Sequence, residues 1–271
     1  DVDRYTINGE YRQVLLAARE VAPEKLKEEA QTWVNQKLFY THGIGIAMSP
    51  ATEFTPEGRP IFFAKDIPAN GEIPISSSEQ GASPEIMVKN PRIYYGENTK
   101  DYVIVDTNTQ ELDYQTGEGD LIVRSYEGSG GVSVGSYFRK LLYAWQMRDI
   151  NILISNQLNE DSKIQYRRSI EERVSTLAPF LKLDKDPYIV AANDQLFWIQ
   201  DAYTTSDKFP YSQPTDEDGT TLGHYNYIRN SIKVVMNAYT GDVAFYIWDT
   251  TDPVALTYQK MFPTLFSDRD S

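Results

Sequence analysis

The residues best suited to chemistry lie in Gly131-Val-Ser133-Val-Gly135, which matches the G-x-S-x-G motif of serine hydrolases. Asp201 and His224 follow in the chain, so the order Ser, Asp, His found in that enzyme class is present. The motif needs a sharp turn between a strand and a helix, but the strand pattern ends near Tyr126, well before Ser133. We therefore interpret the stretch as a glycine-rich turn in which Ser133 caps the next helix. A serine hydrolase using Ser133, Asp201 and His224 is the alternative hypothesis.

The same glycine-rich loop offers a second chemistry, the binding of an anion. Gly128, Gly130 and Gly131 precede a predicted helix, and Arg139 lies within that helix. Backbone N–H groups at a helix N-terminus, with a nearby guanidinium, can hold an anion. The loop lacks Gly-Lys-Ser/Thr and is not a Walker loop. The anion-binding candidates are therefore Gly128, Gly130, Gly131 and Arg139. The alternative is that these glycines only permit a tight turn in the chain.

The histidines and acidic clusters favour no metal or cofactor. His42 and His224 are the only histidines, the chain has no cysteine, and no H-E-x-x-H occurs. We interpret His42 as a hydrogen-bonded structural residue and predict no metal ligands and no cofactor. Three acidic runs lack the spacing of an EF-hand loop, so solvated turns are favoured and Ca²⁺ sensing is the alternative. They begin at Asp184, Asp216 and Asp249.

The first 40 residues predict a helical hairpin. After Asn8, which can cap a helix, Tyr11, Val14, Leu15 and Ala18 recur at intervals of three and four. Pro23 suits the first turn of a second helix that continues to about Leu38.

Residues 42 to 126 read as short strands around a long arm. The predicted strands are His42–Met48, Arg92–Tyr95, Tyr102–Val105, Glu111–Tyr114 and Leu121–Tyr126. Residues 64 to 91 hold four prolines and few large apolar residues, which predicts a loop or arm that crosses or docks on something.

The remainder predicts a helical block followed by two hairpins. An apolar stripe predicts the first helix, and Ser162-Lys-Ile-Gln165 matches a capping box for a second. The stripe consists of Val134, Tyr137, Phe138, Leu141, Leu142 and Trp145. Hairpins are predicted at residues 188–199 and 232–248, with a polar, non-sheet loop at 201–212 between them and a closing helix at 253–262. The fold class is therefore α+β, with mainly antiparallel sheet, an N-terminal helical hairpin, a mid-chain helical block and a C-terminal helix.

The composition bounds the function classes. A formal net charge of −13 disfavours nucleic-acid binding, and the absence of cysteine is compatible with an extracytoplasmic compartment. Residues 121 to 173 are the least acidic part, with a local excess of two positive charges. No apolar run is long enough to span a bilayer. We expect residues 1–271 to form one soluble domain, with a possible subdivision into 1–132 and 133–271.

Several short motifs, in order, resemble uncharacterised protein family 0182. The match runs from about residue 30 to 266 and rests on residues 35–45, 91–97, 126–132, 178–181, 186–190, 199–206, 225–234 and 237–241. The resemblance implies a bacterial integral membrane protein in which several transmembrane helices precede a large soluble region. This chain is then that region, excised from the longer protein. The family has no assigned reaction, so the resemblance carries over no site residue.

These observations lead to one functional expectation and two alternatives. We expect a non-enzymatic extracytoplasmic binding or interaction domain at a bacterial cell membrane, with its own transmembrane segments and other membrane or envelope proteins as partners. The alternatives are the serine hydrolase and an anion- or Ca²⁺-sensing domain.

Overall fold

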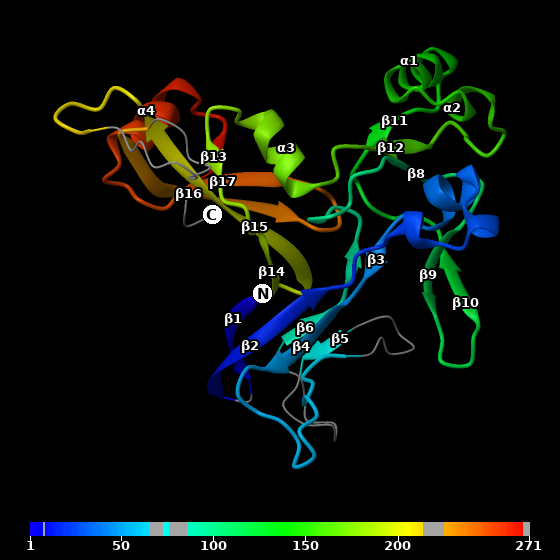
Figure 1. Cartoon of the computed structure of the whole chain (residues 1–271). Coiled ribbons are helices and arrows are strands. Elements are labelled where there is room, and N and C mark those ends of the chain that lie inside the picture. Colours follow the sequence, from blue (N-terminus) through cyan, green and yellow to red (C-terminus); the bar gives the residue numbers. More distant parts are fainter. Residues whose placement is uncertain (8, 66–72, 76–85, 214–224, 268–271) are drawn as a thin grey trace. The chain divides into compact units, whose positions relative to one another are not determined.

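The computed structural model describes residues 1–7, 9–65, 73–75, 86–213 and 225–267 (Figure 1). The chain divides into two compact units. Unit 1 comprises residues 1–169, 189–197 and 237–241, and unit 2 comprises residues 170–188, 198–236 and 242–271.

Unit 1 begins with a β-hairpin where the sequence predicts a helix. β1 (Val2–Ile7), β2 (Glu10–Ala18) and β4 (Ile46–Pro50) form an antiparallel sheet in the order β1-β2-β4. Val14 and Leu16 are buried while Leu15 is exposed, which is the period of two of a strand. The helical prediction was wrong because pairing with β1 and β4 overrode an ambiguous local pattern. Asn8, its proposed cap, lies outside the described residues.

The second predicted helix is replaced by three short turns. These are the 3-10 turns Pro23–Lys25 and Glu28–Ala30 and the π-helical turn Asn35–Phe39. Tertiary hydrogen bonds hold this stretch, since Trp33 Nε1 donates to Asp149 Oδ2 at 2.9 Å and Lys37 Nζ to Asp101 Oδ2 at 2.8 Å. These partners lie far along the chain, so local sequence could not reveal the interruption. The N-terminal helical hairpin is therefore wrong in both halves.

Short antiparallel ladders make up the rest of unit 1. β3 (Gly43–Ile44) pairs with β7 (Arg92–Ile93), and β9 (Glu111–Gln115) pairs with β10 (Leu121–Arg124). β11 (Val132–Ser133), β12 (Lys163–Gln165) and β8 (Val103–Val105) form a sheet in the order β11-β12-β8. The capping box predicted at 162–165 is wrong, because these residues enter β12 and the side chain of Ser162 donates to Asp106 O at 3.1 Å.

The predicted arm at 64–91 is partly described. Ala64 bridges to Met48, and β5 (Ile73–Ile75) pairs with β6 (Ile86–Val88). The other residues of the arm, 66–72 and 76–85, lie outside the described residues.

Helices α1 (Tyr137–Met147) and α2 (Asn151–Ile154) lie side by side in unit 1 (Figure 1). They rest on one hydrophobic core, to which α1 contributes Ala144 and α2 contributes Ile152. The other buried members of that core are Leu38, Ile104, Val134, Leu158 and Ile164.

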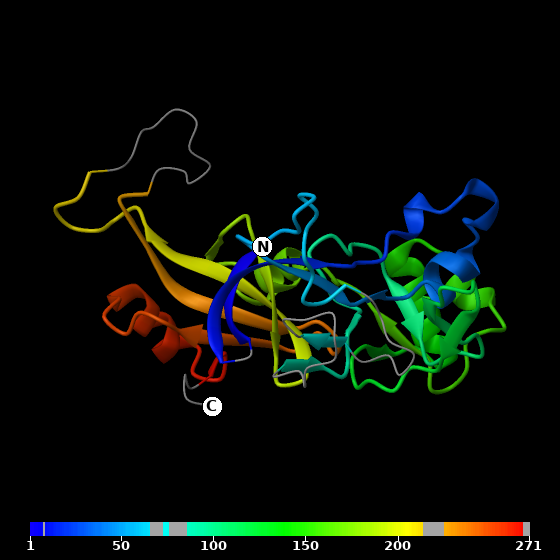
Figure 2. The same ribbon diagram turned by 90° about the horizontal axis from the view of Figure 1, so that it is seen from below.

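The two predicted hairpins form, and their residues are divided between the two units. β15 (Gln195–Ser206) and β16 (Tyr227–Asn237) have residues in both units, and Figure 2 shows them as long paired strands in yellow and orange. β14 (Tyr188–Ala192) joins β15 through Asn193 and Asp194, both at positive φ, as the turn chemistry predicts. β17 (Val243–Ile247) pairs with β16 and with β18 (Phe266–Ser267), while β13 (Lys182–Leu183) lies at the other edge.

The loop predicted at 201–212 starts too early. β15 continues to Ser206 because Ala202 and Thr204 alternate into the core, and Thr204 Oγ1 donates to Asp252 Oδ2 at 2.5 Å. Asp252 also caps α4 (Pro253–Met261), which confirms the predicted closing helix. α3 (Ile170–Leu177) completes unit 2. The result is a mixed α/β fold with mostly antiparallel sheets and few helices. The prediction of helices combined with mainly antiparallel sheet is therefore confirmed, whereas the predicted arrangement of the helices is not.

Candidate functional site

The three residues of the hydrolase hypothesis are divided between the two units and the part of the chain that the structure does not describe. Ser133 lies on β11 in unit 1, Asp201 lies on β15 in unit 2, and His224 is outside the described residues. Asp201 is already engaged, because Lys233 Nζ and Asn230 Nδ2 donate to its two oxygens at 2.5 and 2.7 Å. The hydrolase therefore stays an untested hypothesis.

Ser133 does not cap the next helix. The N-cap of α1 is Ser136, whose side chain accepts from Arg139 N at 3.4 Å. Ser133 instead belongs to β11, opposite Lys163, and its carbonyl accepts from Arg139 Nη1 at 3.2 Å. Because Ser133 belongs to β11, the helix cap lies three residues later than predicted, at Ser136.

The anion-binding candidates Gly128, Gly130 and Gly131 are separated from α1 by β11. A Cβ on Gly130 would lie 2.4 Å from Thr240 O, and Gly131 has a φ of +98°. Close packing and backbone conformation therefore explain these two glycines. The anion site stays a prediction, with Arg139 held on Ser133 O.

A buried cluster of charged and polar side chains escaped the sequence analysis. Strand β9 places Glu111 and Asp113 on one face, two residues apart, and Arg92 on β7 pairs with Asp113. The guanidinium donates in bidentate fashion, from Nε to Oδ1 at 2.7 Å and from Nη2 to Oδ2 at 2.6 Å. Charged residues at i and i+2 of a strand were the available signal, because that spacing puts both on one face.

Glu111 is bound to three neighbours through one oxygen. Thr41 Oγ1 and Tyr94 Oη donate to Oε2 at 2.5 and 2.7 Å, and His42 Nδ1 lies 3.4 Å away. His42 Nδ1 is also 3.0 Å from Thr41 Oγ1, whose only proton goes to Glu111, so Nδ1 is the donor in that contact. The interpretation of His42 as a hydrogen-bonded structural residue therefore agrees with its surroundings. The other oxygen of Glu111, Oε1, has no partner among the described residues.

The electrostatics of the cluster follow from burial and pairing. Burial raises the pKa of Asp113, but hydrogen bonds from His42 and Arg92 outweigh it and lower that pKa to about 2. Burial and the adjacent Glu111 carboxylate raise the pKa of Tyr94 well above its usual range. Because these side chains are nearly inaccessible to solvent, we assign the cluster to the stability of unit 1.

Arg168 is a second buried cation in unit 1. Its side chain donates to the carbonyls of Tyr94, Asp101 and Thr41 at 2.7, 3.1 and 2.5 Å. Burial lowers its pKa to about 10, so the group remains charged at neutral pH. One side chain thus links the segments around residues 41, 94–101 and 168.

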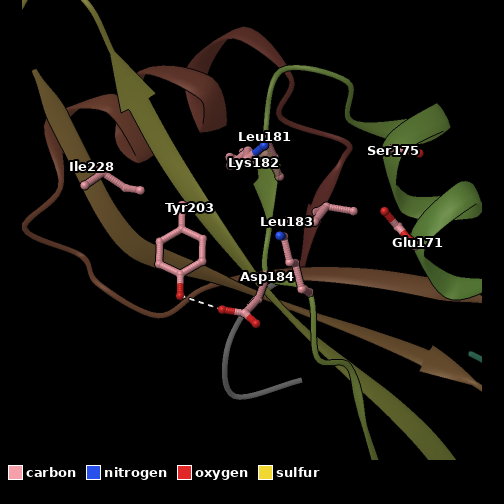
Figure 3. A pocket seen from close by; sticks show the side chains of 9 residues that line it. Glu171, Ser175, Leu181, Lys182, Leu183, Asp184, Tyr203 and Ile228 are labelled. Carbon is pink, nitrogen blue, oxygen red and sulfur yellow. Dashed lines mark hydrogen bonds between the residues drawn. The ribbon is translucent and has the colours of Figure 1, made fainter. Parts of the chain in front are cut away.

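Unit 2 carries a surface pocket of about 540 Å³ beside the edge strand β13 (Figure 3). Its walls include Leu181, Leu183 and the ring of Tyr203, and Glu171 reaches it from α3. Tyr203 Oη donates to Asp184 Oδ2 at 2.7 Å, which raises the pKa of Tyr203 to about 12 and lowers the pKa of Asp184. This hydrogen bond holds the Tyr203 and Asp184 side chains in place on a pocket wall that is otherwise a mixture of apolar and charged residues.

Replacing Tyr203 with Phe tests that pair. We expect the free energy of unfolding to fall by about 1 kcal/mol, the net value of one hydrogen bond, and the pKa of Asp184 to rise toward its ordinary value. Urea unfolding and an NMR titration of Asp184 measure the two effects. Tyr11→Phe, at a largely exposed position, is the control. An unchanged Asp184 titration would show that the hydrogen bond does not form in solution.

The most unusual surface of unit 1 is formed by α1 and α2. The stripe that predicted the first helix does form α1, but only Val134, which precedes the helix, is buried. Tyr137 is 72% exposed, Phe138 67% and Trp145 82%. We use the name α1–α2 face for the exposed apolar side chains of this helix pair, which are Tyr137, Phe138, Leu141, Leu142, Trp145, Ile150 and Ile154. Apolar surfaces of this kind usually mark interaction sites.

Two absences are limited to the described residues. No group of three or more His, Asp or Glu side chains is placed there to hold a metal ion. In the same part of the chain, no helix has the length and apolar character needed to cross a membrane.

Fold and surface together define a mixed α/β protein with a buried charge cluster and an outward-facing apolar helix pair. The chain belongs to the uncharacterised protein family UPF0182, whose family model matches residues 1–271. The match therefore extends beyond the region around residues 30 to 266 that carries the sequence resemblance.

The relatives are much longer than this chain. It is 49% identical over 271 residues to a UPF0182 protein of Pelotomaculum thermopropionicum, covering 100% of this chain and 28% of that protein. A UPF0182 protein of Desulforamulus reducens is 48% identical over 267 residues, and one of Methanospirillum hungatei is 45% identical over 270. The shares of those two proteins covered are 27% and 29%, so the chain spans little more than a quarter of each relative. No solved structure matches the chain.

Proposed function

We propose that this chain is a non-enzymatic interaction domain of a longer, membrane-anchored protein, on the extracytoplasmic side of a bacterial membrane. The observation that carries the proposal is the α1–α2 face. The membrane anchor, the domain's own transmembrane segments, is what the family resemblance implies. The extracytoplasmic side is proposed because the absence of cysteine is compatible with that compartment.

The orientation of α1 supports an interaction role. At 100° per residue, positions 137, 138, 141, 142 and 145 share an arc of about 140°, so they form one continuous stripe. The other side of the helix meets the core through the partly buried Tyr143 and Met147, and Ala144 is buried at the edge of that side. The helix is therefore anchored through one side and presents five large apolar side chains on the other.

The energetics point the same way. Covering one large apolar side chain contributes about 1.5–3 kcal/mol, so leaving seven exposed forgoes a large stabilisation. In relatives at least three times as long, other polypeptide and its surroundings are available to cover this face. A binding role needs no catalytic group.

Cysteine labelling tests whether the face is covered. The chain has no cysteine, so Trp145→Cys introduces a unique thiol within it. In a cysteine-free background of the whole protein, we expect a water-soluble maleimide to modify position 145 at least 10-fold more slowly than in this chain alone. Shielding by the partner is the reason.

The matched control is Glu57→Cys, an exposed turn position in the same unit. It should react at the same rate in both forms. If position 145 also reacts equally fast in both, the face is open in the whole protein and the proposed function is wrong.

A further inference from the structure

The hairpin of β9 and β10 has a free edge that is suited to pairing with a second copy of itself. We propose that β10 pairs antiparallel with β10 of a second copy of this chain, in the register that places Ile122 opposite Ile122 of that copy. This inference goes beyond the proposed function, because it uses none of the residues of the α1–α2 face.

Strand β10 exposes apolar side chains on both of its faces. Leu121 is 53% exposed, Ile122 37% and Val123 40%, and successive side chains of a strand point to opposite faces. β9 and β10 form a two-stranded sheet, so β10 is an edge strand (Figure 1). Proteins usually protect such edges with charged side chains or Pro. Three consecutive exposed apolar residues on an edge therefore indicate a strand that pairs with another.

The backbone of β10 offers hydrogen-bonding groups at this edge. Bonded and non-bonded residue pairs alternate along an antiparallel ladder. Thr116 N donates to Asp120 O at 2.9 Å, so by alternation the N–H and C=O groups of Leu121 point away from β9. Those of Val123 point the same way, because the bulge in this ladder places its extra residue, Asp113, on β9. No other described segment hydrogen-bonds to Leu121 or Val123.

The segment Asp120-Leu-Ile-Val-Arg124 is complementary to its own reversed copy. With Ile122 opposite itself, Leu121 faces Val123 of the second copy, and these are the residues whose backbone groups point outward. Each of the two pairs exchanges two hydrogen bonds, so the two-fold arrangement forms four. A register shifted by one residue would oppose outward groups to inward ones.

The charged ends of the segment permit this register without supplying its energy. Asp120 lies opposite Arg124 of the second copy, so like charges do not meet. Within its own chain, Arg124 donates to Glu127 Oε2 at 2.6 Å and lies 3.9 Å from Asp113 Oδ2. The backbone groups and the three apolar residues therefore carry the pairing. Because one short ladder covers less than the roughly 1,200 Å² of a stable interface, we expect a weak, concentration-dependent dimer.

Disulfide trapping tests the register in this cysteine-free chain. Opposed Cα atoms of a non-bonded pair, here Ile122 with its copy, lie about 4.5 Å apart, which a disulfide can span. The two copies of Leu121 lie diagonally, about 7–8 Å apart, which it cannot. We expect Ile122→Cys to form a disulfide-linked dimer at least 10-fold faster than Leu121→Cys at equal concentration, although Leu121 is more exposed.

A mixture of Leu121→Cys and Val123→Cys chains should link to each other at least 10-fold faster than either variant links to itself. Linking rates that follow exposure, with Leu121→Cys as fast as Ile122→Cys, would overturn the proposal.

Sedimentation equilibrium tests the dimer without cysteine. Ile122→Lys brings two like charges face to face and should weaken the dimer at least 10-fold. Phe54→Lys makes the same kind of change at a 70% exposed position elsewhere in unit 1 and should leave it unchanged. Circular dichroism and urea unfolding confirm that both variants are folded. A chain that stays monomeric at millimolar concentration, or a dimer weakened equally by both substitutions, would contradict the pairing of β10.

Discussion

Replacing Asp113 with Asn is expected to lower the free energy of unfolding by about 3–5 kcal/mol at neutral pH, the range for breaking a buried ion pair. The substitution keeps the shape of the side chain but removes the charge that Arg92 contacts at 2.6 and 2.7 Å. The guanidinium then stays buried without its counter-charge. Asp120→Asn, at an exposed turn position, is the control and should change stability by less than about 0.5 kcal/mol. Urea unfolding monitored by tryptophan fluorescence gives both values.

The same variant makes a prediction about pH. The pKa of Asp113 is lowered to about 2 in the folded state from an ordinary value of 3.8, so the folded protein binds this proton less readily than the unfolded chain. The stabilisation is complete above the unfolded pKa and is lost as the pH falls toward the folded pKa. Between pH 5 and 2 the difference in unfolding free energy between the protein and Asp113→Asn should shrink by about 2 kcal/mol. A constant difference would show that Asp113 is not the titrating group.

A double substitution separates the cost of a stranded charge from the value of the pair. Arg92→Met combined with Asp113→Leu removes both charges and fills the space with apolar atoms. It should cost less than Asp113→Asn alone, because neither buried charge is left unpaired. A double variant as unstable as the sum of both single variants would contradict this explanation.

Replacing Arg168 with Met is expected to destabilise the protein by at least about 3 kcal/mol, since each buried carbonyl left without a donor costs about 1–3 kcal/mol. The carbonyls of Thr41, Tyr94 and Asp101 all lose their partner, although removal of a buried charge offsets part of the loss. Arg168→Lys should recover only part of the stability, because one ammonium cannot reproduce the planar fork of donors. Arg4→Met, on the exposed side of β1, is the control.

Hydrogen exchange adds a local measurement for Arg168. The amides near Thr41, Tyr94 and Asp101 should exchange faster in Arg168→Met than those of the α4 region in unit 2. Uniformly faster exchange across both units would mean that Arg168 supports the chain as a whole rather than this junction.

These two effects and the proposed binding surface depend on different parts of unit 1. The buried cluster and Arg168 hold segments from residues 41 to 168 together, whereas none of the seven side chains of the α1–α2 face belongs to the buried core. Substitutions on the face should therefore change binding and leave stability nearly unaffected. Substitutions in the cluster should do the reverse.

Local sequence determined the elements whose signals are short in range. The positive-φ turn at Asn193-Asp194 and the cap Asp252 with Pro253 specify a hairpin and a helix through residues only a few positions apart. The stripe from Tyr137 to Trp145 likewise specified a helix. The motifs that carry the family resemblance could also be found in the sequence, and the family model confirms the family over the whole chain.

Only the tertiary structure decided which side of each element is buried. It also decided where pairing with distant segments overrides the local preference for a helix. β2 is a strand rather than a helix because β1 and β4 pair with it, and its local pattern fitted both periods. Arg92 lies on β7, whereas Glu111 and Asp113 lie on β9, and the tertiary structure brings them into one buried cluster. A buried charge is tolerated only when it is paired, and here the paired residues come from different strands. The stripe on α1 predicts a helix but not its direction. Because the core accepts the side of α1 that carries Tyr143, Ala144 and Met147, the apolar residues of the stripe are left outside.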